Sequence, residues 1–269
     1  MAGRIITITS GKGGVGKTTT TGNLAVALAQ LQRRVICLDL DLGLRNLDLI
    51  LGLENRIVYD IMDVIEGRVR WRQALVRDKR IDNLSLLPAA QWREKKALAE
   101  SQIQRLCQDL ATDTDFVLID CPAGIEEGFK NAVRPADEIL IVATPEVSSI
   151  RDADRVIGLV EGIGKPPPQL ILNRLRPAMV SRGEMLSVND VVALLKINLI
   201  GVVPEDTMVI SNTNLGMPVT YARHSHAGAE FQRIARRLIG EAVPFAPLEP
   251  ANWLSRLSDA FSPNRKTLV

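Results

Sequence analysis

The sequence predicts an α/β fold: one mostly parallel, twisted sheet of about seven or eight strands, flanked by helices on both faces. Short apolar runs rich in Val, Ile and Leu alternate with longer segments of helical periodicity, which is the pattern of repeated strand–helix–strand units. A glycine-rich loop joins the first apolar run to the first helical segment. The 269 residues, 46% of them hydrophobic, suffice for a single core of this kind.

The loop between the first strand, expected at 4–10, and the first helix, expected at 18–32, carries the most specific signal. It fits the pattern of glycine, four residues, glycine, lysine and Ser/Thr, whose glycines and helix N-terminus hold phosphate. In such a loop Lys17 reaches the β- and γ-phosphates, and Thr18 places its hydroxyl on Mg²⁺. The predicted ATP and Mg²⁺ site comprises Gly11, Lys12, Gly13, Gly14, Val15, Gly16, Lys17 and Thr18.

Two further strands end in carboxylates. The strand at 34–40 is followed by Asp41, and the four apolar residues of the strand at 116–120 precede Asp120, which is the Walker B pattern. Because the carboxyl ends of parallel strands meet at one edge of a sheet, we expect both side chains near the phosphate loop. Asp120 is predicted to hold Mg²⁺, whereas for Asp41, judged from its position alone, a helix cap or turn residue is the alternative.

Lys12 gives the loop a second lysine, and residues 12–18 thereby resemble the deviant Walker A ATPases, the MinD/ParA/nitrogenase-iron-protein group. The resemblance implies that Lys12 reaches across a dimer to the partner's nucleotide, so that ATP drives dimerisation. The alternative for Lys12 is a solvated charge beside the mouth of the loop.

Segments 39–48, 58–61 and 64–67 narrow the resemblance to the MinD branch, the septum-site-determining ATPases, and the similarity runs nearly end to end. It implies an ATP-hydrolysing homodimer that binds the inner membrane reversibly and recruits a division inhibitor to control where the cell divides. In that cycle Lys12 and Lys17 neutralise phosphate charge. Asp41 orients the attacking water, and Asp120 supports the metal.

The remaining strands are expected at 84–88, 138–144, 169–173 and 199–204, and the remaining long helices at 94–110, 148–162 and 225–241. The resemblance places the ends of the last two strands at the adenine, although ordinary loop chemistry explains these residues equally well. It also makes the helix at 148–162 a surface for the inhibitor MinC and the regulator MinE, where ordinary capping is the alternative. The base contacts are then Asn173, Pro204, Glu205 and Asp206, and the partner contacts Arg151, Asp152 and Asp154.

Three prolines in residues 244–250 end the packed domain near residue 243. We therefore predict an ATPase domain at 1–243, a linker at 244–252 and an amphipathic tail at 253–269. Trp253, Leu254, Leu257 and Phe261 lie within an arc of about 120° on that tail. MinD proteins end in such a helix, which binds anionic membrane; the alternative is docking on the protein's own body or on a partner.

The composition limits the compartments in which the protein would function and the partners it would bind. Cys37, Cys107 and Cys121 lie in apolar runs and are expected to be buried thiols in a reducing compartment, and His224 and His226 to lie at the surface. Neither a signal peptide nor a spanning segment is apparent, so we expect a cytoplasmic protein, peripheral on the inner face of the membrane. The net charge of +2 gives no reason to expect nucleic acid as a partner.

Three relatives of the same superfamily are the rival interpretations. A ParA-like DNA-segregation ATPase would need a basic surface cluster, whereas this chain is near neutral with an apolar tail. An electron-transfer ATPase like the nitrogenase iron protein needs cysteines to hold a cluster, and Cys107 and Cys121 are poorly placed for that. The flagellar-number ATPase shares the phosphate loop, and only the match at 45–48 argues against it.

Overall fold

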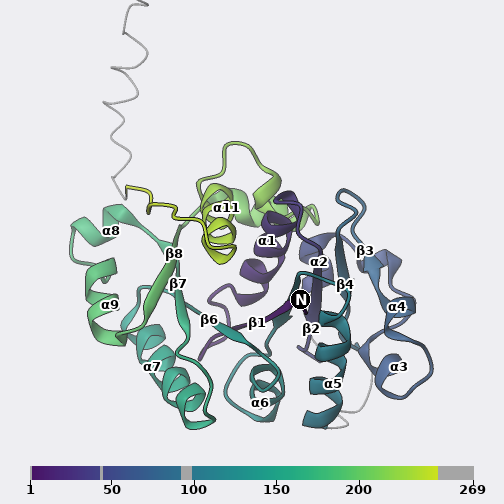
Figure 1. Ribbon diagram of the computed structural model, residues 1–269. Coiled ribbons are helices and arrows are strands. Elements are labelled where there is room, and N and C mark those ends of the chain that lie inside the picture. Colours follow the sequence, from purple (N-terminus) through teal and green to yellow (C-terminus); the bar gives the residue numbers. More distant parts are fainter. Residues whose placement is uncertain (1, 43–44, 92–98, 248–269) are drawn as a thin grey trace, which may run out of the picture.

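One eight-stranded sheet organises the described residues, 2–42, 45–91 and 99–247, of the computed structural model (Figure 1). The strand order is β3-β4-β2-β5-β1-β6-β7-β8, and only the β3–β4 pair is antiparallel. The mostly parallel sheet predicted from the sequence is thus confirmed. The strands are β1 Arg4–Thr9, β2 Val35–Asp39, β3 Val76–Arg77, β4 Leu84–Leu87, β5 Phe116–Asp120, β6 Glu138–Ala143, β7 Gln169–Leu175 and β8 Asn198–Pro204.

Helices cover both faces of the sheet (Figure 1). α1, α2 and α11 pack on one face, and α5, α6 and α7 on the other. The helices are α1 Lys17–Gln30, α2 Leu47–Leu51, α3 Ile61–Ile65, α4 Trp71–Ala74, α5 Glu100–Ala111, α6 Glu127–Val133, α7 Val147–Gly162, α8 Pro177–Ser181, α9 Val188–Leu195, α10 Thr207–Asn214 and α11 His226–Leu238, with 3₁₀ turns η1 Glu54–Arg56 and η2 Val219–Tyr221.

The central strand β1 shows why the sequence folds this way. Its side chains alternate between the two faces, so that Ile6 and Ile8 pack with Leu24 and Leu28 of α1, while Ile5 joins the core under α5 to α7. A strand buried on both faces has few charged residues along its length, and after Arg4 this strand contains only Ile and Thr. The phosphate loop follows directly from this central, buried strand, so its position is fixed by the core.

Most expected elements appear within a few residues of their predicted bounds, and the differences have local causes. The helix expected at 94–110 begins at Glu100, because its N-cap Ala99 has an extended backbone, and it ends at Ala111; residues 92–98 lie outside the described residues. The last helix ends at Leu238, not near 241. The two-residue strand β3 and the short helices α2, α3, α4, α6, α8, α9 and α10 were not predicted. Elements of two to eight residues show too few turns of periodicity to be recognised.

The cysteines and histidines lie where their sequence context predicts. All three cysteines are free and buried, and burial raises the pKa of Cys107 and of Cys121 to about 12, as expected for unreactive thiols. Both histidines are exposed. No helix in the described ranges has the length and apolar character needed to cross a membrane. The tail with Trp253, Leu254, Leu257 and Phe261 lies outside the described residues, so its helix and the domain bounds stay predictions.

Candidate nucleotide site

The loop from β1 to α1 forms an open cradle of backbone. Gly14 and Gly16 have φ angles of +79° and +99°, which glycine adopts without strain. A Cβ atom added at Gly14 would meet no atom within 4 Å, so the outer side of the loop is open. The first hydrogen bond of α1 runs from the Thr20 N–H to the Gly16 carbonyl at 2.9 Å, and the N–H groups of the turn before it are available to an anion.

Lys17 is the first residue of α1 and lies at the base of this cradle. Only 7% of its surface is exposed, which is rare for a lysine unless a negative partner is close. The positive charge of Lys17 acts on the buried carboxyl of Asp120 and partly offsets the rise of its pKa. The cradle therefore combines backbone N–H groups with one buried cation, which is the arrangement that phosphate groups require.

Asn173, at the end of β7, holds the cradle from the side. Its Nδ2 donates a hydrogen bond to the Val15 carbonyl at 2.8 Å. A Cβ atom at Gly16 would lie 2.4 Å from the same nitrogen, so Gly16 is required for space as well as for its positive φ. The amide nitrogen of Asn173 thus binds the loop through one of its two hydrogens, and contact of Asn173 with a base stays a prediction.

Three carboxylates gather beside the first turn of α1. β2 and β5 pair in a register that places Asp39 opposite Asp120, and each residue is 1% exposed. One oxygen of Asp120 accepts a hydrogen bond from the Thr21 hydroxyl at 3.1 Å, and one oxygen of Asp39 accepts from the Asp41 N–H at 2.9 Å. Asp41 itself is half-buried. The charge of Asp41 acts on Asp120, so these two carboxylates lie near each other, and their roles stay predictions.

These carboxylates have unusual acidities. Burial, followed by the charge of Asp120, raises the pKa of Asp39 well above its ordinary range. Burial raises the pKa of Asp120 to about 6, against hydrogen bonding from Thr18 and Thr21 and the charge of Lys17. Two carboxylates that face each other inside a protein repel, and a bound cation would relieve that repulsion.

The residues present therefore fit a magnesium ion. Carboxylate and hydroxyl oxygens are the ligands that Mg²⁺ prefers, and here they lie next to a phosphate cradle. Thr18 and Asp120 would hold the ion, as predicted, with Asp39 behind them. When bound, Mg²⁺ supplies positive charge that offsets the charge of the phosphate oxygens.

Replacing Asp120 by Asn is expected to stabilise the ligand-free chain at high pH. The folded pKa of about 6 exceeds the ordinary 3.8, so ionising Asp120 opposes folding. This cost is absent below the ordinary pKa, grows as the pH rises toward 6 and is fully present above it. Urea unfolding should therefore show a gain on the order of 1–3 kcal/mol at pH 8 and a smaller gain at pH 5.

Asp154→Asn, at an exposed position on α7, is the matched control and should change stability little at either pH. A gain of equal size at both pH values, or no gain at pH 8, would contradict the electrostatic explanation for Asp120→Asn.

Lys12 occupies a different environment from Lys17. It is exposed, and its Nζ donates a hydrogen bond to the Ser148 hydroxyl at 3.4 Å. Beneath it, a Cβ atom at Gly11 would lie 2.4 Å from the carbonyl oxygen of Asp152. The loop therefore lies directly against the first two turns of α7, and Lys12 is at the outer rim of the site.

The predicted partner contacts lie on this same helix. Arg151 and Asp154 are exposed, whereas Asp152 is half-buried and contacts the loop through its backbone. A protein that bound the exposed side of α7 would thus touch the helix that supports the phosphate loop. Binding by Arg151, Asp152 and Asp154 remains a prediction.

The predicted base contacts lie at the ends of β7 and β8. Pro204 ends β8, and Glu205 forms an ion pair with Arg176. The Asp206 carboxylate caps α10, accepting from the Met208 N–H at 2.9 Å and from the Ser225 hydroxyl at 2.7 Å. Capping thus engages the Asp206 carboxylate, and contact of the turn at 204–206 with a base stays a prediction.

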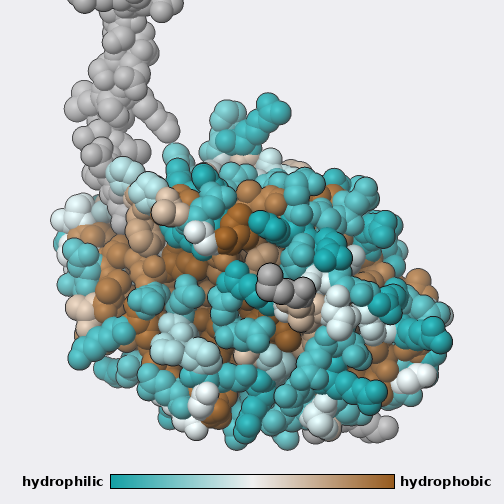
Figure 2. All heavy atoms as spheres, viewed as in Figure 1, coloured by the Kyte–Doolittle hydropathy of each residue, from teal (hydrophilic) through white to brown (hydrophobic). Residues whose placement is uncertain are grey.

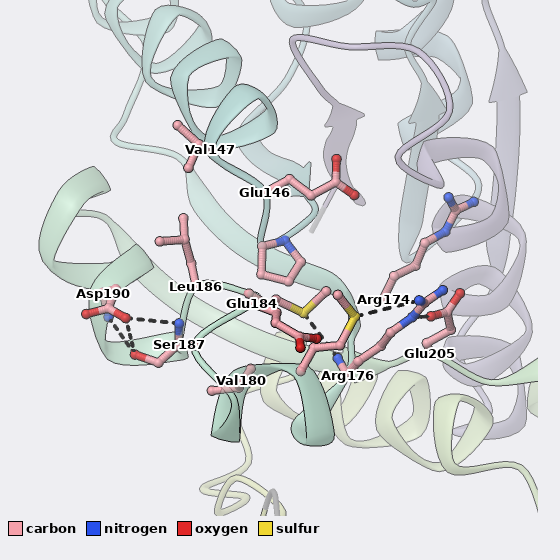
Figure 3. A pocket seen from close by; sticks show the side chains of 14 residues that line it. Glu146, Val147, Arg174, Arg176, Val180, Glu184, Leu186, Ser187, Asp190 and Glu205 are labelled. Carbon is pink, nitrogen blue, oxygen red and sulfur yellow. Dashed lines mark hydrogen bonds and ion pairs between the residues drawn. The ribbon is translucent and has the colours of Figure 1, made fainter.

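A cavity of about 700 Å³ opens on this side of the molecule. Figure 3 shows side chains from the start of α7, the end of β7, α8 and α9 around it. Its volume is in the range that small ligands occupy, and Arg174, which follows Asn173 in β7, is part of its lining. The charged residues of its wall are Glu146, Arg174, Arg176, Glu184, Asp190 and Glu205.

Two residues of the site are missing from the set predicted from the sequence. Asp39 is the last residue of β2, two positions before Asp41. The sequence shows this carboxylate at a strand end, but its place opposite Asp120 depends on how the two strands pair. Ser148 meets Lys12 across 136 positions of sequence. A lone serine at the start of a helix carries no signal of its own beyond capping.

Comparisons with known proteins agree with this geometry. The family described as the CobQ/CobB/MinD/ParA nucleotide binding domain matches residues 6–219. The septum site-determining protein MinD of Bacillus subtilis is 50% identical over 252 residues, which cover 93% of this chain and 94% of that protein.

Two solved structures are similar over most of their length. The MinC:MinD cell division protein complex of Aquifex aeolicus contains a chain with 50% identity and a TM-score of 0.86, covering 91% of this chain and 98% of that one. MinD of Pyrococcus horikoshii, complexed with Mg-ADP, has 31% identity and a TM-score of 0.79, covering 87% of this chain and 95% of that one.

Proposed function

Because the chain belongs to the MinD family of septum site-determining cell-division proteins, we propose that it cycles between an ATP-bound homodimer on the inner membrane and a released form. It is a P-loop ATPase whose substrates are ATP, with Mg²⁺, and water. The observation that carries the proposal is the pair of lysines in one loop, with Lys17 buried at its base and Lys12 exposed at its rim.

Hydrolysis needs little covalent chemistry from the protein, because positioning and charge stabilisation are sufficient for phosphoryl transfer. Lys17 and the N–H groups of the cradle bind the phosphates, and Asn173 keeps the loop in shape through the Val15 carbonyl. We assign Asp41 to orient the attacking water, since it follows the strand whose end meets the site. Asp39 anchors Asp41 by accepting its N–H.

Lys12→Ala is expected to separate dimerisation from nucleotide binding. An exposed lysine at the rim adds little to binding within one subunit, but it is available to the nucleotide of a second subunit. With ATP, sedimentation should therefore show loss of the dimer and a turnover lowered by about 100-fold, while affinity for a fluorescent ADP analogue falls less than tenfold. Normal dimers and normal turnover would exclude a role for Lys12 across the dimer.

Asp41→Ala is expected to leave the ATP-bound dimer intact and to slow hydrolysis by about 100-fold or more, because the attacking water loses its acceptor while the cradle is unchanged. Single-turnover hydrolysis and sedimentation of the purified variant measure the two effects separately. The exposed Asp154→Ala is the control. Rapid hydrolysis by Asp41→Ala would instead support the alternative that Asp41 is a turn residue.

We propose that α7 binds a MinC-like inhibitor and a MinE-like or other topological regulator through Arg151, Asp152 and Asp154. The Aquifex structure is titled as a complex of MinC with MinD, and the exposed face of α7 lies next to the phosphate loop. A partner on this face would be able to sense whether nucleotide is bound.

The membrane part of the proposal rests on residues 253–269 and is tested against DNA binding in one assay. Liposomes and DNA are each pelleted with the purified chain in the presence of ATP or ADP. Pelleting with anionic liposomes in ATP only, and with DNA in neither nucleotide, is the expected result. ATP-dependent pelleting with DNA but not with liposomes would favour the ParA-like alternative.

A further inference from the structure

An apolar cavity of about 580 Å³ lies at the β8 edge of the sheet, away from the nucleotide site. α9 forms one wall, β8 the floor and residues 245–246 the other wall; we call it the edge groove. Figure 2 shows hydrophobic surface gathered on this side of the molecule, over β8 and α9. Its apolar lining includes Val188, Val192, Ala193, Leu199, Val202 and Phe245.

The groove is incompletely filled by the described chain. Phe245 is 48% exposed, and Val192 and Leu199 are half-buried. An apolar hollow of this volume is as large as many ligand pockets. Leaving such surface in water is unfavourable, so an apolar occupant would be stabilised there.

The position where the described chain ends indicates which occupant is available. Arg237 of α11 fixes the segment before the end, because its guanidinium donates to the carbonyls of Val243 and Pro244, each at 2.9 Å, and lies 4.3 Å from the centre of the Phe245 ring. Buried Glu230 holds Arg237 in place at 2.9 Å. The chain is thereby delivered to the wall of the groove and continues from Pro247, one residue beyond the wall residue Ala246.

The continuing 22 residues, 248–269, carry the apolar arc predicted from the sequence. Trp253 is six positions after Pro247, a span of at most about 20 Å for an extended chain. A connection this short keeps the arc at high effective concentration next to the groove. No second chain would have to be recruited to fill it.

We propose that the tail docks in the edge groove through Trp253, Leu254 and Leu257 when the protein is not on a membrane. The groove and the membrane then compete for the same apolar arc. This inference rests on the proposed membrane function of the tail. In the released form the groove would cover the apolar arc. A single subunit would therefore bind membrane more weakly than its free tail would.

The docking can be measured on Trp253 in the full chain. Trp71→Phe with Trp92→Phe leaves Trp253 as the only one of the three tryptophans. Without nucleotide or vesicles, acrylamide should quench Trp253 several-fold less than it quenches a synthetic peptide of residues 248–269. Equal quenching of chain and peptide would overturn the proposal.

Two neighbouring residues of α9 provide a matched pair. Ala193 is exposed and lines the groove, whereas Leu194 is 58% exposed and does not line it. Ala193→Asp should raise the quenching of Trp253 to that of the peptide, and Leu194→Asp should leave it low. Because both positions are exposed, both variants should fold, and an identical response of the two would contradict docking in this groove.

Vesicle binding separates this inference from the function on which it rests. If nine-tenths of the tails are docked, Ala193→Asp should raise the nucleotide-free affinity for phosphatidylglycerol vesicles about tenfold. No rise, in a chain that does bind vesicles through its tail, would count against docking. Protected Trp253 together with no vesicle binding in any variant would support docking and refute the membrane function instead.

Discussion

Lys17→Ala is expected to reduce ATP hydrolysis by at least about 100-fold, the loss typical when one preorganised charge or donor at a developing charge is removed. The lysine is almost completely enclosed at the base of the cradle, so no other described side chain lies in the same position to replace it. Water that entered the space would supply no positive charge. Both the affinity for ATP and the rate of the bound state should therefore fall.

The measurement is phosphate release at saturating ATP, with binding of a fluorescent ATP analogue measured on the same preparation. Lys79→Ala is the control, because Lys79 is an exposed lysine next to the edge strand β3, remote from the loop. Because the charge of Lys17 acts on buried Asp120, the unfolding free energy of Lys17→Ala is measured as well, and turnover is compared where both chains are folded. Unchanged turnover in Lys17→Ala would remove the central assignment.

Leu257→Glu is expected to abolish ATP-dependent binding to liposomes while leaving ATP-dependent dimerisation intact. The substitution places a charge in the middle of the apolar arc. Full burial of one large apolar side chain contributes about 1.5–3 kcal/mol, and interfacial burial contributes less, so one tail alone binds weakly. In the dimer the second tail binds at high effective concentration, which can raise the avidity by roughly 10² to 10⁴. Because the dimer carries two tails, Leu257→Glu removes the apolar contact from both of them.

Pelleting with anionic liposomes in ATP and in ADP measures this effect, and sedimentation without liposomes measures the dimer. Ser258→Glu is the matched control, because it places the same charge on the polar side of the predicted helix, and it should weaken binding only modestly. Deletion of residues 251–269 should have the same effect as Leu257→Glu. Full ATP-dependent pelleting after that deletion would show that the tail does not bind the membrane.

The most specific predictions for the site come from patterns of consecutive residues. The phosphate loop needs particular residue types at fixed spacing, so its eight residues identify it without knowledge of the packing. The strand ending in Asp120 was found at its true bounds because a strand buried on both faces has a continuous apolar run.

The features of the site that could not be predicted from the sequence depend on contacts between distant segments. Asp39 and Asp120 face each other because two strands pair in one register. Asp206 was predicted to contact a base, but whether its carboxylate is free depends on the hydroxyl of Ser225, 19 positions away. Asn173 was predicted for the same role, and its bond to the Val15 carbonyl joins residues 158 positions apart. Local patterns contain no information about such partners.

The two edge strands of the sheet, β3 and β8, affect how readily the protein could aggregate. An open strand edge is a template for pairing with another chain, which is dangerous for a protein that we propose collects at high density on a membrane. At one end β3 has only two residues and runs antiparallel to its neighbour. At the other end the guanidinium of Arg237 occupies the Ile200 carbonyl of β8 at 2.9 Å. The β3 edge therefore offers almost no free ladder, and at the β8 edge Arg237 occupies one acceptor that a second chain would need.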